Sequence, residues 1–147
     1  MISLPEKVQA LLDMHLSTAL ETLGVEIVAV DENEVRLRMP ITSKVRQPAG
    51  LLHGGISMFL AETAASFHCV YLVDIREIIP VGIEINGSHL SSAKDGTVEA
   101  IGRVLNRGRS LVVHEVDIFH VEENKLLTKA RVTNYLKRLQ SSENSKS

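Results

Sequence analysis

A single long apolar helix constrains this chain more than any other feature of its sequence. From Gly54 to about Leu72 there is no proline, and Glu62 is the only charged residue, so we expect one uninterrupted helix. Its broad apolar stripe comprises Ile56, Phe59, Leu60, Thr63, Ala64 and Phe67. Small residues would also let it approach a sheet closely, namely Ala61, Ala64, Ala65 and Ser66. The rest of the chain must therefore supply a surface that covers this helix.

Strand-like segments flank the helix, two before it and four after it. In the second of the early pair, Val35, Leu37 and Met39 alternate with Arg36 and Arg38, which predicts a half-buried strand. The six segments are Val25–Val30, Val35–Met39, Pro80–Leu90, Thr97–Leu105, Ser110–Val121 and Leu126–Leu136. Short connections between the last four, including a turn at 106–109, predict an antiparallel sheet.

The elements form one two-layer α+β domain, with the long helix packed against the sheet. Residues from Val8 to Leu23 recur with helical spacing after Pro5, so we expect an N-terminal helix that ends at Gly24. A loop of functional length follows at 40–52. We expect the domain to span 1–138 and a polar, disordered tail to occupy 139–147. An open sheet leaves an edge strand that a second copy could cover.

Bulk properties exclude several classes of function. The 147 residues carry a net charge of −2 and only 3% aromatic residues, which argues against nucleic-acid binding. No apolar stretch is long enough to span a membrane, and no secretory leader opens the chain, so we expect a cytoplasmic protein. No metal-ligand spacing, G-x-S-x-G or nucleotide loop occurs, and no metal or redox cofactor is expected. Cys69 is the only cysteine, and we expect it to be buried and inert.

The start of the long helix gathers hydrogen-bonding groups. Gly54 and Gly55 expose backbone N–H groups at a helix N-terminus, where they can hold developing negative charge. His53 precedes them, and the polar Gln47 lies six residues upstream. A tight helix start is the structural alternative, but the added polar groups favour a site for acyl chemistry.

Glu62 is the second candidate on this helix. No Lys or Arg stands three or four residues away on either side, so no local ion pair explains a carboxylate among apolar neighbours. Gly54 and Glu62 are eight residues apart, which corresponds to about 12 Å of helical rise. Both cannot touch one reacting carbonyl from a single helix. If both belong to one site, two antiparallel copies must supply it.

Other polar residues have competing interpretations. His89 could line a site, whereas His15, His68, His114 and His120 are interpreted as structural or exposed. The sequence Arg107-Gly108-Arg109 in a predicted turn is either a solvated hairpin tip or a grip for a phosphate, because guanidinium groups bind phosphate through paired hydrogen bonds.

These residues together resemble a known family. The segment Gln47-Pro48-x-Gly50-Leu51-Leu52-His53-Gly54-Gly55, followed by Ala61-Glu62-Thr63, is similar to hotdog-fold acyl-CoA thioesterases of the phenylacetic-acid and 4-hydroxybenzoyl-CoA type. The likeness continues through Gly82-Ile83-Glu84-Ile85-Asn86, His89, the Arg107–Arg109 turn and Val116-Asp117-Ile118. It covers roughly residues 10–138. It implies a curved antiparallel sheet wrapped around one long helix, and homodimers that often pair into homotetramers.

The resemblance also implies residue roles. The Gly54 N–H would polarise the thioester carbonyl, Gln47 and His53 would orient the substrate, and Glu62 of the partner subunit would act as nucleophile or general base, with both routes left open. Ser66 would assist Glu62. Residues with an implied part in substrate binding are Gly55, His89, Arg107, Gly108 and Arg109.

The implied reaction is hydrolysis of an acyl-CoA or acyl-carrier thioester, with coenzyme A present only as part of the substrate. Two alternatives stay open at this point. One is an enoyl-thioester hydratase or dehydratase on the same fold. The other is an acyl-CoA-binding module without catalysis.

Overall fold

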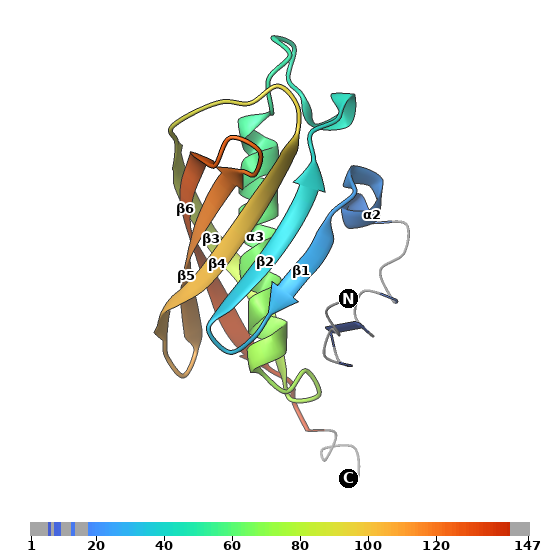
Figure 1. Ribbon diagram of the computed structural model, residues 1–147. Helices are drawn as coiled ribbons and strands as arrows, with labels where there is room; N and C mark the ends of the chain where they lie inside the picture. Colours follow the sequence, from blue (N-terminus) through green and yellow to red (C-terminus); the bar gives the residue numbers. More distant parts are fainter. Residues whose placement is uncertain (1–5, 7, 10–12, 14–17, 142–147) are drawn as a thin grey trace.

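The computed structural model describes residues 6, 8, 9, 13 and 18–141 of the chain (Figure 1). In this part, six antiparallel strands form one sheet in the order β1-β2-β4-β5-β6-β3. The strands are β1 (Glu26–Val30), β2 (Glu34–Pro40), β3 (Ile78–His89), β4 (Thr97–Arg107), β5 (Leu111–His120) and β6 (Lys125–Arg138). Strands β1 and β3 therefore form the two edges of the sheet.

The long helix α3 (Gly54–Leu72) lies along the sheet and contacts β2, β3, β4, β5 and β6. Its bounds are those expected from the sequence. Within residues 18–141 two short helices accompany it, the five-residue α2 (Ala19–Leu23) and the 3₁₀ helix η1 (Ser43–Val45). No helix within the described ranges is both long and apolar enough to cross a bilayer.

The predicted small-residue contact of α3 is confirmed, whereas the predicted apolar stripe is only partly right. Ala61, Ala64 and Ala65 are completely buried. Phe59 and Thr63 are only half-buried and line an open pocket. The stripe was misassigned because α3 carries apolar residues on more than one side, so periodicity alone does not identify the side that packs on the sheet.

The alternation predicted for β2 is confirmed. Val35, Leu37 and Met39 are completely buried against the core. On the other face, Arg38 and Arg36 bind the Glu99 carboxylate of β4, with Nε–Oε2 and Nη1–Oε1 distances of 2.5 and 3.1 Å. Glu99 is buried despite its charge, because the two guanidinium groups lie against it.

The N-terminal helix departs from the prediction. Its end is confirmed, because Gly24 adopts a left-handed conformation with φ of 74° and follows α2 directly. Thr18, however, is extended, with φ −98° and ψ 175°, so the helix is not continuous up to Leu23. Thr18 takes the position just before α2, although its side chain makes no cap hydrogen bond. Most of the earlier part of the predicted helix lies outside the described residues, as does His15.

The predicted turn at 106–109 begins too early. Asn106 and Arg107 still pair with Val113 and Val112 of β5, so β4 extends two residues further than expected. The register shifts between Val104 and Asn106, and this irregularity obscures the alternation that sequence reasoning relies on. At the other end of the domain, Leu139 donates its N–H to the Glu77 carbonyl at 2.8 Å. Residues 142–147 of the predicted tail lie outside the described part.

Two buried histidines join the helix, the sheet and the β1–β2 turn. His68 of α3 and His114 of β5 are both completely buried, and His68 Nδ1 lies 2.8 Å from His114 Nε2. His68 Nε2 lies 2.9 Å from the Asp31 carbonyl, which can only accept, so His68 donates there and accepts from His114. Burial lowers the pKa of both rings, that of His114 to about 4. The structural interpretation of both residues is confirmed. Cys69 is also buried, and burial raises the pKa of its thiol to about 12.

We expect the free energy of unfolding to fall as the pH is lowered from about 6.5 toward 4. An unfolded histidine takes up its proton near pH 6.5, whereas His114 in the folded chain does so only near pH 4. The unfolded state therefore binds more protons in this window, and acid favours it. His114→Gln removes the titrating ring and keeps an amide donor for His68. Urea unfolding at pH 7 and pH 5 should show a smaller pH effect in this variant, and an equal effect would contradict the assignment.

Candidate active site

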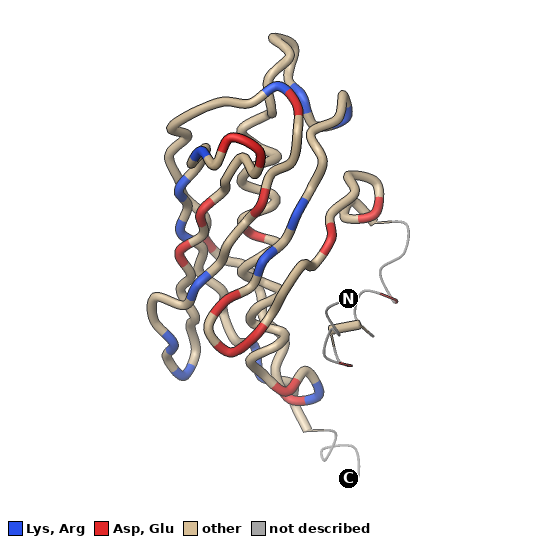
Figure 2. The backbone as a smooth tube through the Cα atoms, viewed as in Figure 1, with Lys and Arg blue, Asp and Glu red and all other residues tan. Residues whose placement is uncertain are grey.

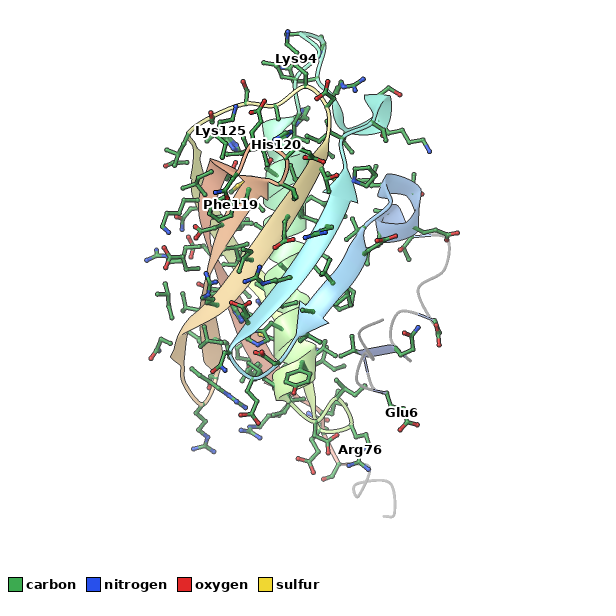
Figure 3. The ribbon with its side chains drawn as sticks, viewed as in Figure 1. Glu6, Arg76, Lys94, Phe119, His120 and Lys125 are labelled. Atoms are coloured by element: carbon green, nitrogen blue, oxygen red, sulfur yellow. The ribbon has the colours of Figure 1, made fainter. Side chains whose placement is uncertain are left out.

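The loop that leads into α3 is held firmly, although it has little regular structure. The Arg46 guanidinium donates to the carbonyls of Lys94 and Ile41 at 2.6 and 3.4 Å. Arg46 also pairs with Leu52 as an isolated antiparallel bridge, and Leu52 donates its N–H to the Ala93 carbonyl. Figure 3 shows Lys94 at the end of the molecule where α3 begins. These bonds fix the position of the helix start.

The first N–H groups of α3 have different partners. His53 caps the helix, and its Nδ1 accepts a hydrogen bond from the Gly55 N–H at 2.8 Å. The N–H groups of Ile56 and Ser57 bond to the His53 carbonyl. Within the described part of the chain, the Gly54 N–H has no acceptor. Of the two glycines, Gly54 is therefore the one with a donor available to a ligand.

His89 lies directly against Gly54. A Cβ atom built on Gly54 would come within 2.6 Å of His89 Nε2, so only glycine allows the ring this close. His89 Nδ1 lies 2.8 Å from the hydroxyl of Thr128, its register partner on β6. The ring is thus held with Nε2 toward the start of α3.

A cavity of about 190 Å³ opens at this point, and we call it the glycine pocket. Gln47, Gly54 and His89 all line it, so three of the residues singled out in the sequence meet here. The Gln47 side-chain oxygen accepts the Ala49 N–H, which holds it in the loop. His53 and Gly55 do not line this cavity in the single chain. Their contact with each other is the cap hydrogen bond.

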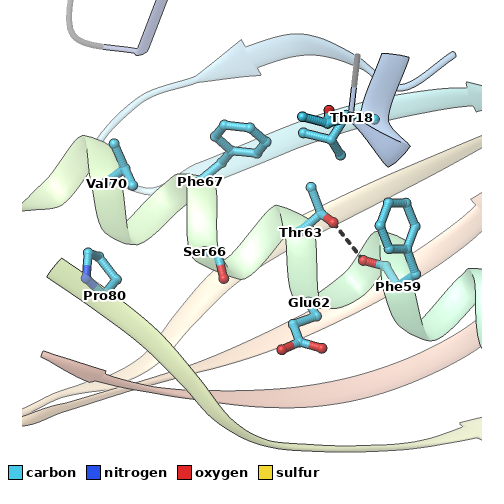
Figure 4. A pocket seen from close by; sticks show the side chains of 9 residues that line it. Thr18, Phe59, Glu62, Thr63, Ser66, Phe67, Val70 and Pro80 are labelled. Atoms are coloured by element: carbon cyan, nitrogen blue, oxygen red, sulfur yellow. Dashed lines mark hydrogen bonds between the residues drawn. The ribbon is translucent and has the colours of Figure 1, made fainter. Parts of the chain in front are cut away.

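A second, larger cavity of about 410 Å³ lies along α3, and we call it the acid pocket. Glu62, Thr63 and Ser66 supply its polar groups from α3, among mostly apolar walls (Figure 4). Figure 4 shows the side chains of Glu62 and Ser66 directed to the β3 side of the helix, away from Thr63 and Phe67. The lining residues are Thr18, Leu20, Phe59, Glu62, Thr63, Ser66, Phe67, Val70 and Pro80. The two pockets share no lining residue.

Glu62 is exposed in the single chain and rests on β3. Its Oε1 is so close to Gly82 that a Cβ built there would lie 2.6 Å from it. No described residue forms an ion pair or hydrogen bond with this carboxylate, in keeping with the absence of a local partner in the sequence. The acid is therefore available for chemistry. Likewise, the described residues include no cluster of three or more His, Cys, Asp or Glu that could hold a metal ion.

Comparison with known proteins identifies the family. The family model described as the thioesterase superfamily matches residues 49–127. A 1,4-dihydroxy-2-naphthoyl-CoA hydrolase from Listeria monocytogenes is 42% identical over 113 residues, which cover 77% of this chain and 90% of that protein. The chain belongs to the thioesterase superfamily.

Solved thioesterases share the architecture. One from Haemophilus influenzae has a TM-score of 0.85 and 33% identity, and the match covers 96% of this chain and 97% of that one. A variant of a thioesterase from Staphylococcus aureus has a TM-score of 0.78 and 40% identity, and the match covers 80% of this chain and 97% of that one. The resemblance to hotdog thioesterases is confirmed, and the chain is a thioester hydrolase. The names of these relatives support neither the alternative of an enoyl-thioester hydratase or dehydratase nor that of a non-catalytic acyl-CoA-binding module.

The Arg107–Arg109 segment of this thioesterase lies far from both glycines. Arg107 Nη2 donates to the carbonyl of Leu72, the last residue of α3, at 3.0 Å. Figure 2 shows basic positions at the tip of the β4–β5 turn, at the opposite end of the sheet from the start of α3. Within one chain, these arginines cannot reach a ligand in the glycine pocket directly. Their predicted contact with a phosphate stays a prediction.

Sequence reasoning missed two residues that support the site. Thr128 carries no motif, and its role depends on lying opposite His89 in the β3–β6 register. Gly82 was noted only as part of the family-like segment, and its contact with Glu62 depends on how β3 lies against α3. Both contacts depend on residues that are far apart in the sequence, so no local sequence pattern predicts them.

Arg107, the last residue of β4, and Arg109 in the turn after it offer a matched comparison. Arg107→Ala removes the donor to the last carbonyl of α3 and should lower the free energy of unfolding by about 0.5–1 kcal/mol. Arg109→Ala, exposed in the turn, should leave stability unchanged. Thermal unfolding of both variants measures the difference.

The same two variants test the phosphate contact. If both raise the KM for acyl-CoA but leave the KM for a substrate without nucleotide unchanged, the arginines bind the phosphate. Unchanged KM values for both substrates would contradict this contact.

Proposed function

We propose that this thioesterase hydrolyses an acyl-CoA, or an acyl-carrier thioester, with the Gly54 N–H as oxyanion donor and Glu62 of a partner subunit as nucleophile or general base. The observation that carries the proposal is the Gly54 N–H. It lacks an acceptor in the described chain and lies at the glycine pocket beside Gln47 and His89. A free donor at a helix N-terminus suits the negative oxygen of a tetrahedral intermediate.

The reaction follows from these groups. The Gly54 N–H polarises the carbonyl, and either Glu62 attacks its carbon or a water activated by Glu62 does so. Collapse of the tetrahedral intermediate breaks the C–S bond, and the sulfur leaves as the thiol after taking up a proton. On the water route Glu62 returns the proton that it took from the water, and the other product is the free acid. On the nucleophilic route the collapse leaves an anhydride between the acyl group and Glu62; a water gives the sulfur its proton, and its hydroxide then attacks the anhydride, which releases the acid and restores the carboxylate. His53 keeps Gly55 occupied through the cap. Gln47 and His89 bound the space around the carbonyl.

A second copy is needed because one chain holds the donor and the acid in separate pockets. Glu62 rests against Gly82, and Gly54 lies against His89, so both half-sites adjoin β3. An antiparallel pair of β3 strands centred between Ile85 and Asn86 would bring Gly82 of one subunit opposite His89 of the other. Glu62 of the partner subunit would then approach Gly54, as the helical spacing requires.

The β3 edge also suits pairing for reasons of surface chemistry. Ile79, Val81 and Ile83 expose 44%, 39% and 57% of their surface in the single chain. At the opposite edge, the residues of β1 after Glu26 are all half-buried. A continuous sheet through β3 would satisfy its free backbone groups and cover these side chains. Pairing of such dimers into tetramers stays a prediction.

The substrate class can be narrowed by the acid pocket. Its walls are mostly apolar, and Phe59 and Phe67 contribute aromatic surface, which suits an apolar or aromatic acyl group. Relatives from Listeria monocytogenes and Escherichia coli are named 1,4-dihydroxy-2-naphthoyl-CoA hydrolases. We therefore include that thioester in the proposed range.

A thiol-release assay tests the function. The panel would contain aromatic, short, medium and long acyl-CoA thioesters, 1,4-dihydroxy-2-naphthoyl-CoA, and acyl-carrier thioesters. We expect turnover of at least one aromatic or apolar acyl-CoA. Absence of thiol release across the panel would overturn the proposal.

Two substitutions at Gly54 separate the donor from the space around it. Gly54→Ala keeps the N–H but adds a Cβ that crowds His89. Gly54→Pro removes the N–H as well, and proline is tolerated as the first residue of a helix. We expect kcat of the proline variant to be about 100- to 1,000-fold below that of the alanine variant, the usual effect of losing one oxyanion donor. Equal kcat values, with unchanged circular dichroism, would remove Gly54 from the chemistry.

Mixed dimers test whether the site is shared. Glu62→Gln and Gly54→Pro should each be nearly inactive alone. After unfolding and refolding together, half of the dimers should be mixed, and each of these has one complete site, so about a quarter of the original activity should return. Co-refolding Glu62→Gln with a chain that carries both substitutions is the control, and it should recover nothing. Failure of the first mixture to recover, when mixed dimers are shown to form, would place the whole site in one subunit.

A further inference from the structure

The Ser66 hydroxyl bonds to the sheet, whereas the neighbouring hydroxyl on α3 bonds to the helix. Thr63 donates to the Phe59 carbonyl at 2.7 Å, the usual bond of a hydroxyl within a helix (Figure 4). Ser66 instead donates to Asn134 Oδ1 on β6, at 3.3 Å. Both hydroxyls line the acid pocket. The orientation of Ser66 is therefore set by a residue outside the helix.

Asn134 is an unusual residue for the interior of this sheet. It is completely buried, yet its Nδ2 has no hydrogen-bond partner among the described residues. A buried donor without a partner costs about 1–3 kcal/mol. A leucine of similar shape would avoid this cost, so stability alone does not explain an asparagine here. Its Oδ1 accepts the hydrogen bond from Ser66, which lines the acid pocket.

The strand neighbour of Asn134 contacts the Glu62 carboxylate, another polar group of the acid pocket. Asn134 pairs in register with Gly82 of β3. Gly82 leaves the space that the Glu62 carboxylate occupies, and the β3 register shifts directly after it. One cross-strand pair thus contacts both Glu62 and Ser66, which lie four residues apart on the same side of α3.

We propose that Asn134 is a positioning residue for thioester hydrolysis, which orients the Ser66 hydroxyl beside the Glu62 carboxylate. This inference rests on the proposed function of Glu62. Because the Ser66 proton is donated to Asn134, the serine oxygen presents only lone pairs to the pocket. Glu62 as a carboxylate also only accepts. A water held between the two must donate both hydrogens, which leaves its own lone pair directed away from them, toward the carbonyl carbon.

The step balances with these groups alone. The water oxygen forms the new bond to the carbonyl carbon, and one water proton passes to the Glu62 carboxylate. The C–S bond then breaks, and the proton is returned to the leaving sulfur. Asn134 does not touch the reacting atoms. It acts through Ser66 by determining which way the hydroxyl points.

A double-mutant cycle tests this role, with Asn134→Leu, Ser66→Ala and the double variant. We expect Asn134→Leu to lower kcat about five- to tenfold, the effect of one lost hydrogen bond, with little change in KM. The double variant should have the same kcat as Ser66→Ala, because Asn134 acts only through Ser66. The melting temperature of Asn134→Leu should be equal to or above that of the unchanged protein, since the unpaired Nδ2 is removed.

Thr133→Val is the matched control on the same strand. Its hydroxyl bonds Glu84, and its activity should be unchanged.

Several outcomes would overturn the inference. Independent, multiplicative losses of kcat in the double variant would show that Asn134 does not act through Ser66. A lower melting temperature with unchanged kcat would show a purely structural role. If Asn134→Leu does not fold, Asn134→Ala enters the same cycle with the same expectations for kcat and KM, and with a lower melting temperature because it leaves a cavity. The proposed function fails separately, if the unchanged protein releases no thiol or if Glu62→Gln retains full activity.

Discussion

The close packing of α3 on the sheet is the contact on which the site depends. Ala61, Ala64 and Ala65 are completely buried. Opposite them, a Cβ built on Gly102 would lie 3.1 Å from Val35 Cγ1 and 3.8 Å from Ala64 Cβ. An extra methylene group in such an interface costs about 1–3 kcal/mol, whereas an exposed ion pair contributes about 0–1 kcal/mol. Packing, more than the ion pairs of the outer face, therefore sets the rotation of the helix.

Once that rotation is fixed, the placement of the polar groups follows. Glu62 and Ser66 are brought to the β3 side of α3, where β3 and β6 provide the surroundings for them. The helix start is held independently, by the His53 cap and by the Arg46 bonds to two carbonyls. In each chain, the cap and the loop bonds thus position the Gly54 N–H, and the packing of α3 positions the Glu62 carboxylate in a separate pocket.

The sequence predicted the elements that depend on local pattern. The bounds of α3, the alternation of β2 and the glycine that ends α2 are local features, and they are as expected. The separation of Gly54 from Glu62 also follows from helix geometry alone. Predictions failed where pairing across the sheet overrides local pattern, as at Asn106 and Arg107, which remain in β4. The supporting contacts of His89 and Ser66 come from β6 residues about 40 and 68 positions away, and no local signal marks such partners.

The division of polar groups between two pockets has a consequence for how this protein can change. If the pockets combine across a two-fold axis, the acyl wall and the oxyanion donor of each site come from different chains, yet one gene encodes both. A substitution along α3 then alters both sites of the dimer at once. A substitution that weakens the pairing of two subunits along β3 would then abolish catalysis, although it changes no reacting group. Substitutions in α3 and β3 can therefore change the substrate preference and the affinity between subunits at the same time.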